Sequence, residues 1–545
     1  MKKLMRSFMS ETTCHGFSHI YRSKSLFMKG FWTISLLVLM LTFWFSVLTL
    51  FAEFLERKII SQTTTERADM TGLQIPSLII CNRNFFSMKK LQSGAGPERE
   101  TQGLNPCQAS HSPSDFGLDS NASSYLMLMA GNPILAKTNL SEEDQAVLRQ
   151  ADLAVRNVLW QRNLTLSQLI NALSYTCEEL IASCMHNFNY LKGSECCKYY
   201  VHTETQLGLC HMYVSRPESR QVLNGEYMGV SLYLSVPEDD VPDLSRHILD
   251  MTKVTKFGLQ MTVTSNLTYP NLAVVSQGTT VTPGAHTSIA LQLTEINEEK
   301  VKTPIDVWEP PCIPAHSLDF RQDVGAFLDN NINCFDGIIL RCFHEMCGCA
   351  LYGMRLEDTP MCTLNETRDC YRLLFLELSK FMNTNAFDNL PAGDEDEVVL
   401  EKARQCIVYV HSECQNRRVC QHSEYDYTVT TSPIHPKIMD VIVQDLNIEN
   451  ASKVASVTVF FSTMDYTLIK LSRMSQEEVI SDLGGYMGLC LGSSIITWIE
   501  IVIYKVTLIF TFFKAVTKVF LCKLQHSELE SSFLKARNLQ QNAQP

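Results

Sequence analysis

Two apolar stretches of membrane length, one near each end of the 545-residue chain, constrain its fold more than any other feature. The first covers residues 31–54 and is almost uncharged, and the second covers about 483–513 and carries only Glu500 and Lys505. Each is long enough to cross a bilayer of roughly 30 Å as a helix. The first is too long for the apolar part of a signal peptide, and no convincing cleavage site follows it. We therefore predict two retained spans.

The charges beside the two stretches predict their orientation. Basic residues dominate both flanking tails, and such residues favour the cytoplasmic side. We expect cytoplasmic tails at 1–30 and 514–545, spans at 31–54 and 481–513, and an extracellular domain at 55–480. The whole chain carries a net charge of −12 although its tails are basic. The extracellular domain is therefore strongly acidic, which attracts cations and argues against nucleic-acid binding.

Cysteine usage agrees with an extracellular domain. The chain has 20 cysteines, and all except Cys14, Cys490 and Cys522 lie between Cys81 and Cys420. This distribution predicts a disulfide-stapled domain. Closely spaced thiolates can also hold zinc, but paired C-x-x-C knuckles are absent, so we expect no metal and no cofactor. Glycosylation sequons fall in the same region, at Asn121, Asn139, Asn163, Asn266, Asn365 and Asn450.

Strand and helix patterns alternate along the extracellular domain. Period-two alternation and apolar runs predict strands at 73–81, 258–264, 288–293 and 455–462. Helical runs begin at Ser141 and Thr165, a further helical patch covers 371–380, and the polar residues 92–123 suggest a mobile loop. The expected fold is a two-span α-helical membrane protein with a large disulfide-rich α+β extracellular domain, in which helical subdomains surround a β-sheet core.

Polar residues interrupt the second apolar stretch. Left unpaired in hydrocarbon, such groups would cost several kcal/mol. Gly485, Gly488 and Gly492 fall at positions i, i+3 and i+7, which gives a small helix face for close approach. Ordinary helix packing would explain these glycines. It would not explain the acidic and hydroxyl residues of the same segment, which are Asp482, Ser493, Ser494 and Glu500. We interpret the segment as a helix that faces water or ions.

Short motifs over nearly the whole length point to one family. They are TTCHGFSHI at 12–20, IPSLIICNRN at 75–84, TQLGLC at 205–210, the cysteine-rich region, and the opening segment of the second span. In these motifs the chain resembles the degenerin/epithelial sodium channel superfamily, which includes acid-sensing and peptide-gated channels. The resemblance implies a homo- or heterotrimeric, sodium-selective, voltage-independent and amiloride-sensitive channel of the plasma membrane, gated through its extracellular domain.

The resemblance also implies disulfide pairs. These are Cys81 with Cys210, Cys177 with Cys184, Cys312 with Cys420, Cys347 with Cys370, and Cys349 with Cys362. Cys334, Cys342, Cys406 and Cys414 would supply the remaining rungs of a ladder. The spacing from Cys334 to Cys347 departs from the family pattern, so the partners of Cys334 and Cys342 stay open. Cys107, Cys196 and Cys197 are additional, and an odd cysteine would be unpaired or join two chains.

Roles for pore residues follow from the resemblance in the same way. Gly492, Ser493 and Ser494 would form the selectivity filter, a break in the second helix whose oxygens replace part of an ion's hydration shell. Ser481 would be a small residue required at the gate, and Asp482 would concentrate cations there. Glu500 would lie deeper in the pore, but Ile503 stands where acid-sensing channels carry a second carboxylate. His15 and Gly16 would be the cytoplasmic gating motif.

Other classes of protein fit the sequence less well. An ATP-gated trimer shares the two-span topology but needs a lysine cluster for phosphates, and none is convincing. A two-span scavenger or lipid receptor would not need glycines, hydroxyls and a carboxylate within one span. Histidines such as His344 and His411 lack partners for a catalytic triad or metal site, so no enzyme is expected. The gating stimulus stays open between acid, peptide, mechanical force and constitutive opening.

Overall fold

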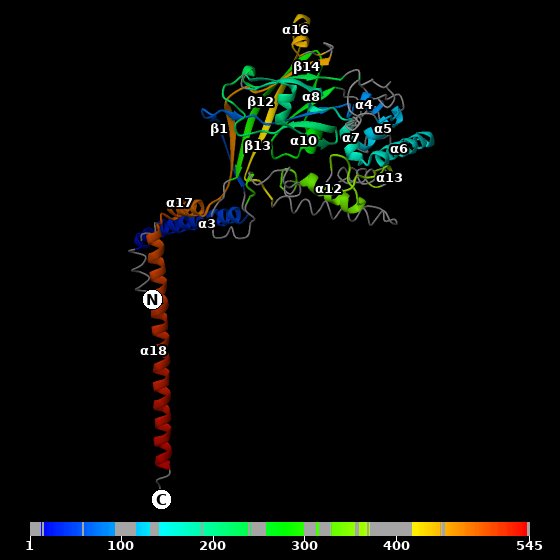
Figure 1. The fold of residues 1–545 in the computed structure, drawn as a ribbon. Helices are drawn as coiled ribbons and strands as arrows, with labels where there is room; N and C mark the ends of the chain where they lie inside the picture. The colour runs from blue at the N-terminus through cyan, green and yellow to red at the C-terminus, as the bar shows by residue number, and fades with distance from the viewer. Residues whose placement is uncertain are drawn as a thin grey trace, which may run out of the picture. The chain divides into compact units, whose positions relative to one another are not determined.

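The chain divides into two compact units (Figure 1). The computed structural model describes residues 12, 16–56, 59–92, 116–130, 141–186, 189–237, 240, 258–298, 312–315, 328, 330–354, 359–367, 370, 417–446, 448 and 453–541. A helical unit comprises 1–60, 301–306 and 472–545, and a β-rich unit comprises 61–300 and 307–471. The β-rich unit therefore corresponds closely to the predicted extracellular domain.

An eight-stranded sheet forms the centre of the β-rich unit. Its strands, in spatial order, are β1 (Ile59–Arg67), β15 (Asp465–Arg473), β12 (Ala285–Glu298), β14 (Val454–Phe461), β9 (Val230–Ser235), β4 (Ile181–His186) and β5 (Asn189–Lys192), and β13 (Gln421–Pro433) pairs with β12. The predicted strands at 288–293 and 455–462 lie in β12 and β14, which run parallel. One face of this sheet carries alternate apolar residues and packs into the core.

A second sheet of five strands packs beside the first. Its order is β11 (Thr279–Val281), β10 (Leu259–Thr264), β3 (Ser77–Asn82), β7 (Gly208–Tyr213) and β6 (Tyr200–Thr205). The strand predicted at 73–81 is divided into β2 (Leu73–Gln74), which pairs with β8 (Arg220–Gln221), and β3. Pro76 separates the two pieces and has no N–H to donate to a ladder. Leu78, Leu232 and Val457 meet in one core, so both sheets share it.

Helices α4 to α7 form a separate core beside the sheets (Figure 1). They are α4 (Met88–Gln92), α5 (Ser120–Ala130), α6 (Glu142–Arg162) and α7 (Leu166–Leu173). The predicted helix starts are confirmed, because Ser141 Oγ accepts the Asp144 N–H at 3.1 Å and Thr165 forms a reciprocal capping box with Gln168. The mobile loop expected at 92–123 is wrong at its end, where Asp119 caps the buried helix α5.

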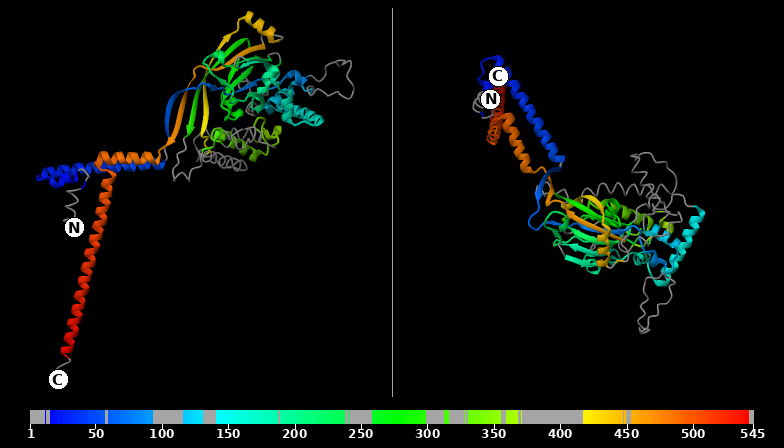
Figure 2. Two further views of the ribbon diagram at one scale, coloured as in Figure 1. Left: turned by 60° about the vertical axis from the view of Figure 1, so that its left-hand side comes forward. Right: turned by 90° about the horizontal axis from the view of Figure 1, so that it is seen from above.

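Several shorter helices complete the β-rich unit, and α16 lies at one end of the eight-stranded sheet (Figure 2). Besides α16 (Pro436–Leu446), they are α8 (Cys177–Leu180), α9 (Gly193–Cys196), α10 (Pro270–Ser276), α12 (Cys334–Cys347), α13 (Leu364–Glu366) and the 3-10 helices η2 (Cys197–Tyr199) and η3 (Glu226–Met228). The helical patch predicted at 371–380 lies outside the described residues.

Four of the expected disulfide pairs are present, and one is wrong. Cys81 pairs with Cys210, Cys312 with Cys420, Cys347 with Cys370, and Cys349 with Cys362. Cys177 does not pair with Cys184. Instead, Cys177 bonds Cys197 and Cys184 bonds Cys196. Cys196 belongs to α9 and Cys197 to the adjacent η2, whereas Cys177 belongs to α8 and Cys184 to β4. Because α9 contacts both α8 and β4, each of the two adjacent cysteines bonds a different partner.

The remaining cysteine and sequon predictions divide between described and undescribed residues. Cys334 is disulfide-bonded. Cys107, Cys406, Cys414, Asn139, Asn450 and the side chain of Cys342 lie outside the described residues. Asn163, Asn266 and Asn365 are exposed, and Asn121 is half-buried at the start of α5. Exposure is compatible with glycosylation at the first three sites.

Candidate pore-lining segment

The helical unit contains α2 (Phe17–Arg22), α3 (Leu26–Glu56), α17 (Gln476–Leu491) and α18 (Ile495–Gln541). α3 extends past both ends of the span predicted at 31–54. Among the residues that the structure describes, two segments are long and apolar enough to cross a membrane, α3 and residues 495–518 of α18, and both are largely exposed. A core helix of a soluble protein would be mostly buried, so exposure favours lipid as the surroundings of these segments.

The second apolar stretch opens with α17, which starts at a capping box. Ser475 Oγ accepts the Glu478 N–H at 3.1 Å, and Glu478 Oε2 accepts the Ser475 N–H at 2.8 Å. Glu477 and Glu478 also place negative charge in the first turn, where the helix dipole favours it. The start of α17 is therefore fixed a few residues before the predicted gate at Ser481 and Asp482.

A break of three residues separates α17 from α18, at Gly492, Ser493 and Ser494. Gly492 has φ 54° and ψ 32°, the left-handed conformation that ends helices and favours glycine. Its N–H donates to Gly488 O at 3.0 Å, and the Ser493 hydroxyl donates to Met487 O at 3.2 Å. The three residues predicted as a filter are thus the ones at which the helix is interrupted.

Thr497 fixes the start of α18, a role that the sequence analysis missed. Its Oγ1 accepts the Ser494 N–H at 3.1 Å and lies 3.4 Å from Ser494 Oγ, and the Thr497 side chain is 1% exposed. The spacing Ser-x-x-Thr is a polar analogue of the capping box and is visible in the sequence. Ser494 therefore acts as the N-terminal cap of the second half of the segment.

One face of α17 packs on α3. Phe43 and Val47 of α3 form a buried cluster with Cys490 and Leu491, and Leu483, Tyr486 and Met487 pack against it. The two helices lie side by side in both views of Figure 2. These α17 residues recur every three or four positions, as the buried face of a helix does.

The opposite face of α17 carries the predicted gate and glycine positions. Ser481, Gly485, Gly488 and Gly492 follow one another at spacings of four, three and four, and we call them the α17 stripe. Ser481, Gly485 and Gly488 are exposed, as is Asp482 beside them. A Cβ added at Gly485 or Gly488 would meet no atom of the described residues within 4 Å. Packing among the described residues therefore does not require either glycine.

The remaining predicted site residues that the structure describes lie in α18 and at the start of α2, away from the α17 stripe. Glu500 is half-buried in α18, and Ile503 is 60% exposed one turn later. Gly16 begins α2 with φ 96°, and a Cβ there would come within 2.7 Å of Leu36 on α3. His15 lies outside the described residues.

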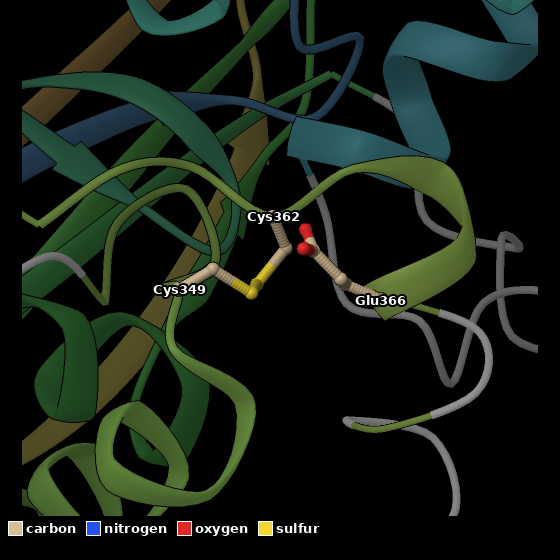
Figure 3. A group of neighbouring side chains, drawn as sticks. All are labelled: Cys349, Cys362 and Glu366. Carbon is tan, nitrogen blue, oxygen red and sulfur yellow. A yellow bond between two sulfur atoms is a disulfide. The ribbon is translucent and has the colours of Figure 1, made fainter.

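One group of side chains has the composition of a metal site and is not one. Figure 3 shows Glu366 beside Cys349 and Cys362, whose sulfur atoms are bonded to each other. A disulfide has no thiolate to offer a metal. The group therefore belongs to the disulfide framework around α13.

Comparison with known proteins decides the family. The family model described as amiloride-sensitive sodium channel matches residues 8–504, which include the first candidate span, α17, the break and the start of α18. The chain belongs to the amiloride-sensitive sodium channel family. It is also similar to Pickpocket protein 19 of Drosophila melanogaster, with 17% identity over 534 residues that cover 92% of this chain and 89% of the relative.

Membership confirms the resemblance seen in the motifs and gives a general function. Members of the amiloride-sensitive sodium channel family are oligomeric channels rather than enzymes, and they carry sodium through a membrane. This chain is a cation-channel subunit with two plasma-membrane spans and a large extracellular domain. The disulfides of the β-rich unit suit the oxidising environment that such a domain would meet.

Proposed function

We propose that the chain forms the pore of a trimeric, sodium-selective channel that is blocked by amiloride and gated through its extracellular domain. The observation that carries the proposal is the α17 stripe, which lies opposite the face packed on α3 and runs into the break at Gly492–Ser494. In a trimer, homomeric or with related subunits, three such stripes would face a common axis. Both tails would then be cytoplasmic, as the basic flanks indicate.

The residues along the stripe and beyond it would act in series. Ser481 would be the small residue that lets the gate close, and Asp482 would raise the local cation concentration. The oxygens of the break would replace part of the ion's hydration shell, so that ring size and field strength select sodium. Glu500 would lie deeper along the same path. Gly16, with His15, would couple the cytoplasmic end of α3 to gating.

Current recordings test this proposal. The chain is expressed in oocytes, alone and with related subunits, and sodium current is recorded with and without amiloride while pH, peptide and pressure are varied. We expect an amiloride-blocked current in at least one combination. A subunit that reaches the surface in every combination and never conducts would contradict the proposal.

Substitution of Ser481 tests the gate more sharply. Ser481→Phe places a bulky side chain on the exposed stripe, where closure would bring three copies together, so resting current should rise. Ile480→Phe on the same helix lies off the stripe and serves as the matched control. If a conducting Ser481→Phe channel closes as the parent does, the assignment of Ser481 is wrong.

A further inference from the structure

A half-open cavity of about 670 Å³ lies between α16 and the outward face of the eight-stranded sheet, both of which belong to the β-rich unit. Its walls come from α16, η3 and strands β4, β5, β9, β12 and β14. This volume falls within the range of small-molecule sites. None of the predicted gate, filter or pore residues lines this cavity.

The sheet contributes a polar wall to this cavity. Along β9, Leu232 and Leu234 point into the core, so Tyr233 points to the opposite face and into the cavity. On β14, Ser456 lies opposite Tyr233 and Thr458 lies opposite Ser231 in the register. Ser456 and Thr458 are 5% and 3% exposed although they belong to the outward face. A helix that only packed on the sheet would be expected to cover apolar side chains there.

The cavity is negatively charged. Glu226 and Asp445 line it, and none of the described lining residues is Lys or Arg. His286 Nε2 lies 2.6 Å from Glu226 Oε1, and the Ser288 hydroxyl donates to the same oxygen at 2.7 Å. Ser288, and after it His286, hold the pKa of Glu226 below its usual value. Asp445 is exposed and accepts a hydrogen bond from the Tyr190 hydroxyl at 3.3 Å.

Three tyrosines stand around the two carboxylates: Tyr190, Tyr227 and Tyr233. Tyr227 is 87% exposed and Tyr190 is 44% exposed, so both rings have faces available at the rim. Burial, and after it Tyr190 and Asp445, raises the pKa of Tyr233, which keeps its phenol neutral. Aromatic faces attract cations, and carboxylates give them charge-assisted hydrogen bonds.

We propose that this cavity binds a small organic cation, an ammonium or guanidinium group attached to an apolar body. The charged group would lie between Asp445 and Glu226 and against the tyrosine rings. The apolar body would lie against the side chains that α16 turns to the cavity, Val441, Ile442 and Leu446. A calcium ion fits this lining less well, because it needs six to eight oxygen ligands and gains nothing from apolar walls.

Binding to the full-length protein in lipid nanodiscs tests the proposal without requiring that the channel conducts. The charged probes are phenethylamine and benzylguanidine, and the neutral control is 2-phenylethanol. Isothermal titration calorimetry at pH 7.4 should show saturable binding of a charged probe and at least about tenfold weaker binding of the neutral one, as expected for a charge-assisted contact. Absence of saturable binding by both charged probes, or equal binding of the alcohol, would overturn the proposal.

Paired variants locate the binding site. Asp445→Asn should weaken binding of the charged probe about tenfold. Asp440→Asn changes the same charge on an exposed position of α16 that does not line the cavity, so it should bind as the parent does. Tyr227→Phe keeps an aromatic face and should retain binding, whereas Tyr227→Leu should lose about threefold or more. Equal affinity of Asp445→Asn and Asp440→Asn would show that the probe binds elsewhere.

Discussion

Alanine at Gly485 or Gly488 should have opposite effects on a single chain and on an assembled pore. Within the described part of one chain, the added methyl group meets no atom within 4 Å. Alanine is favoured over glycine in a helix interior by about 0.8–1.0 kcal/mol. The two substitutions together should therefore stabilise an isolated α17 by roughly 2 kcal/mol. Any loss of function must then come from a neighbour that the single chain does not contain.

In the proposed pore, the α17 stripe meets the same stripe of neighbouring subunits. An extra methyl group in a close contact costs about 1–3 kcal/mol, and every subunit repeats it. A net cost of about 1.4 kcal/mol already reduces the competent population tenfold. The expected result is therefore a fall in current of tenfold or more, against the direction that helix propensity alone predicts.

Sodium current in oocytes, normalised to surface-biotinylated protein, measures this effect. Gly484→Ala is the matched control, because Gly484 is an exposed glycine of α17 that also has no atom within 4 Å of an added Cβ and lies off the stripe. Current should be retained in Gly484→Ala and fall in Gly485→Ala and Gly488→Ala at equal surface expression. Equal currents in all three variants would refute the placement of the stripe at the pore axis.

Two further predictions concern the β-rich unit. Burial raises the pKa of Asp336 from 3.8 to about 6, so the folded state binds this proton more tightly than the unfolded state. The contribution of the protonated carboxyl to stability is full below pH 3.8 and is lost as pH rises through 6. Asp336→Asn should therefore stabilise the protein by up to about 3 kcal/mol above pH 6 and have little effect below pH 4, which thermal unfolding across pH would show. Cys177→Ser with Cys197→Ser should add no free thiol in a denaturing maleimide assay and should lower stability by about 3 kcal/mol, since a loop of 20 residues is opened. Detection of two new thiols in that variant would contradict the observed pairing and would support a disulfide between Cys177 and Cys184.

Features set by a few neighbouring residues could be predicted from the sequence. The start of α6 at Ser141 and of α7 at Thr165 depends on hydrogen bonds within one turn, so the pattern of a cap followed by apolar residues was sufficient. The interruption at Gly492 was expected from the family resemblance and not from a local pattern, although the structure shows that it depends on one left-handed residue. Hydropathy located the two apolar stretches because each is continuous in the sequence.

Features that depend on distant segments could not be predicted. Cys177 and Cys184 are close in the sequence, but α9 and η2 bring Cys196 and Cys197 to them, and no local pattern records this. The buried start of α5 was hidden in a polar stretch whose Asp119 acts as a cap. The cavity under α16 depends on the register between β9 and β14, which sequence periodicity does not give.

The break between α17 and α18 also changes the electrostatics of the span. One continuous helix would carry a single macrodipole with its partial charges only at the two ends. Two helices place the C-terminal end of α17, with about half a negative elementary charge, and the N-terminal end of α18, with about half a positive one, beside Gly492–Ser494. The Ser494 and Thr497 hydroxyls interact with the backbone at the positive end. A cation at the break would therefore be attracted by the carbonyl end of α17 and repelled by the N–H end of α18, so two opposite partial charges would set the field there.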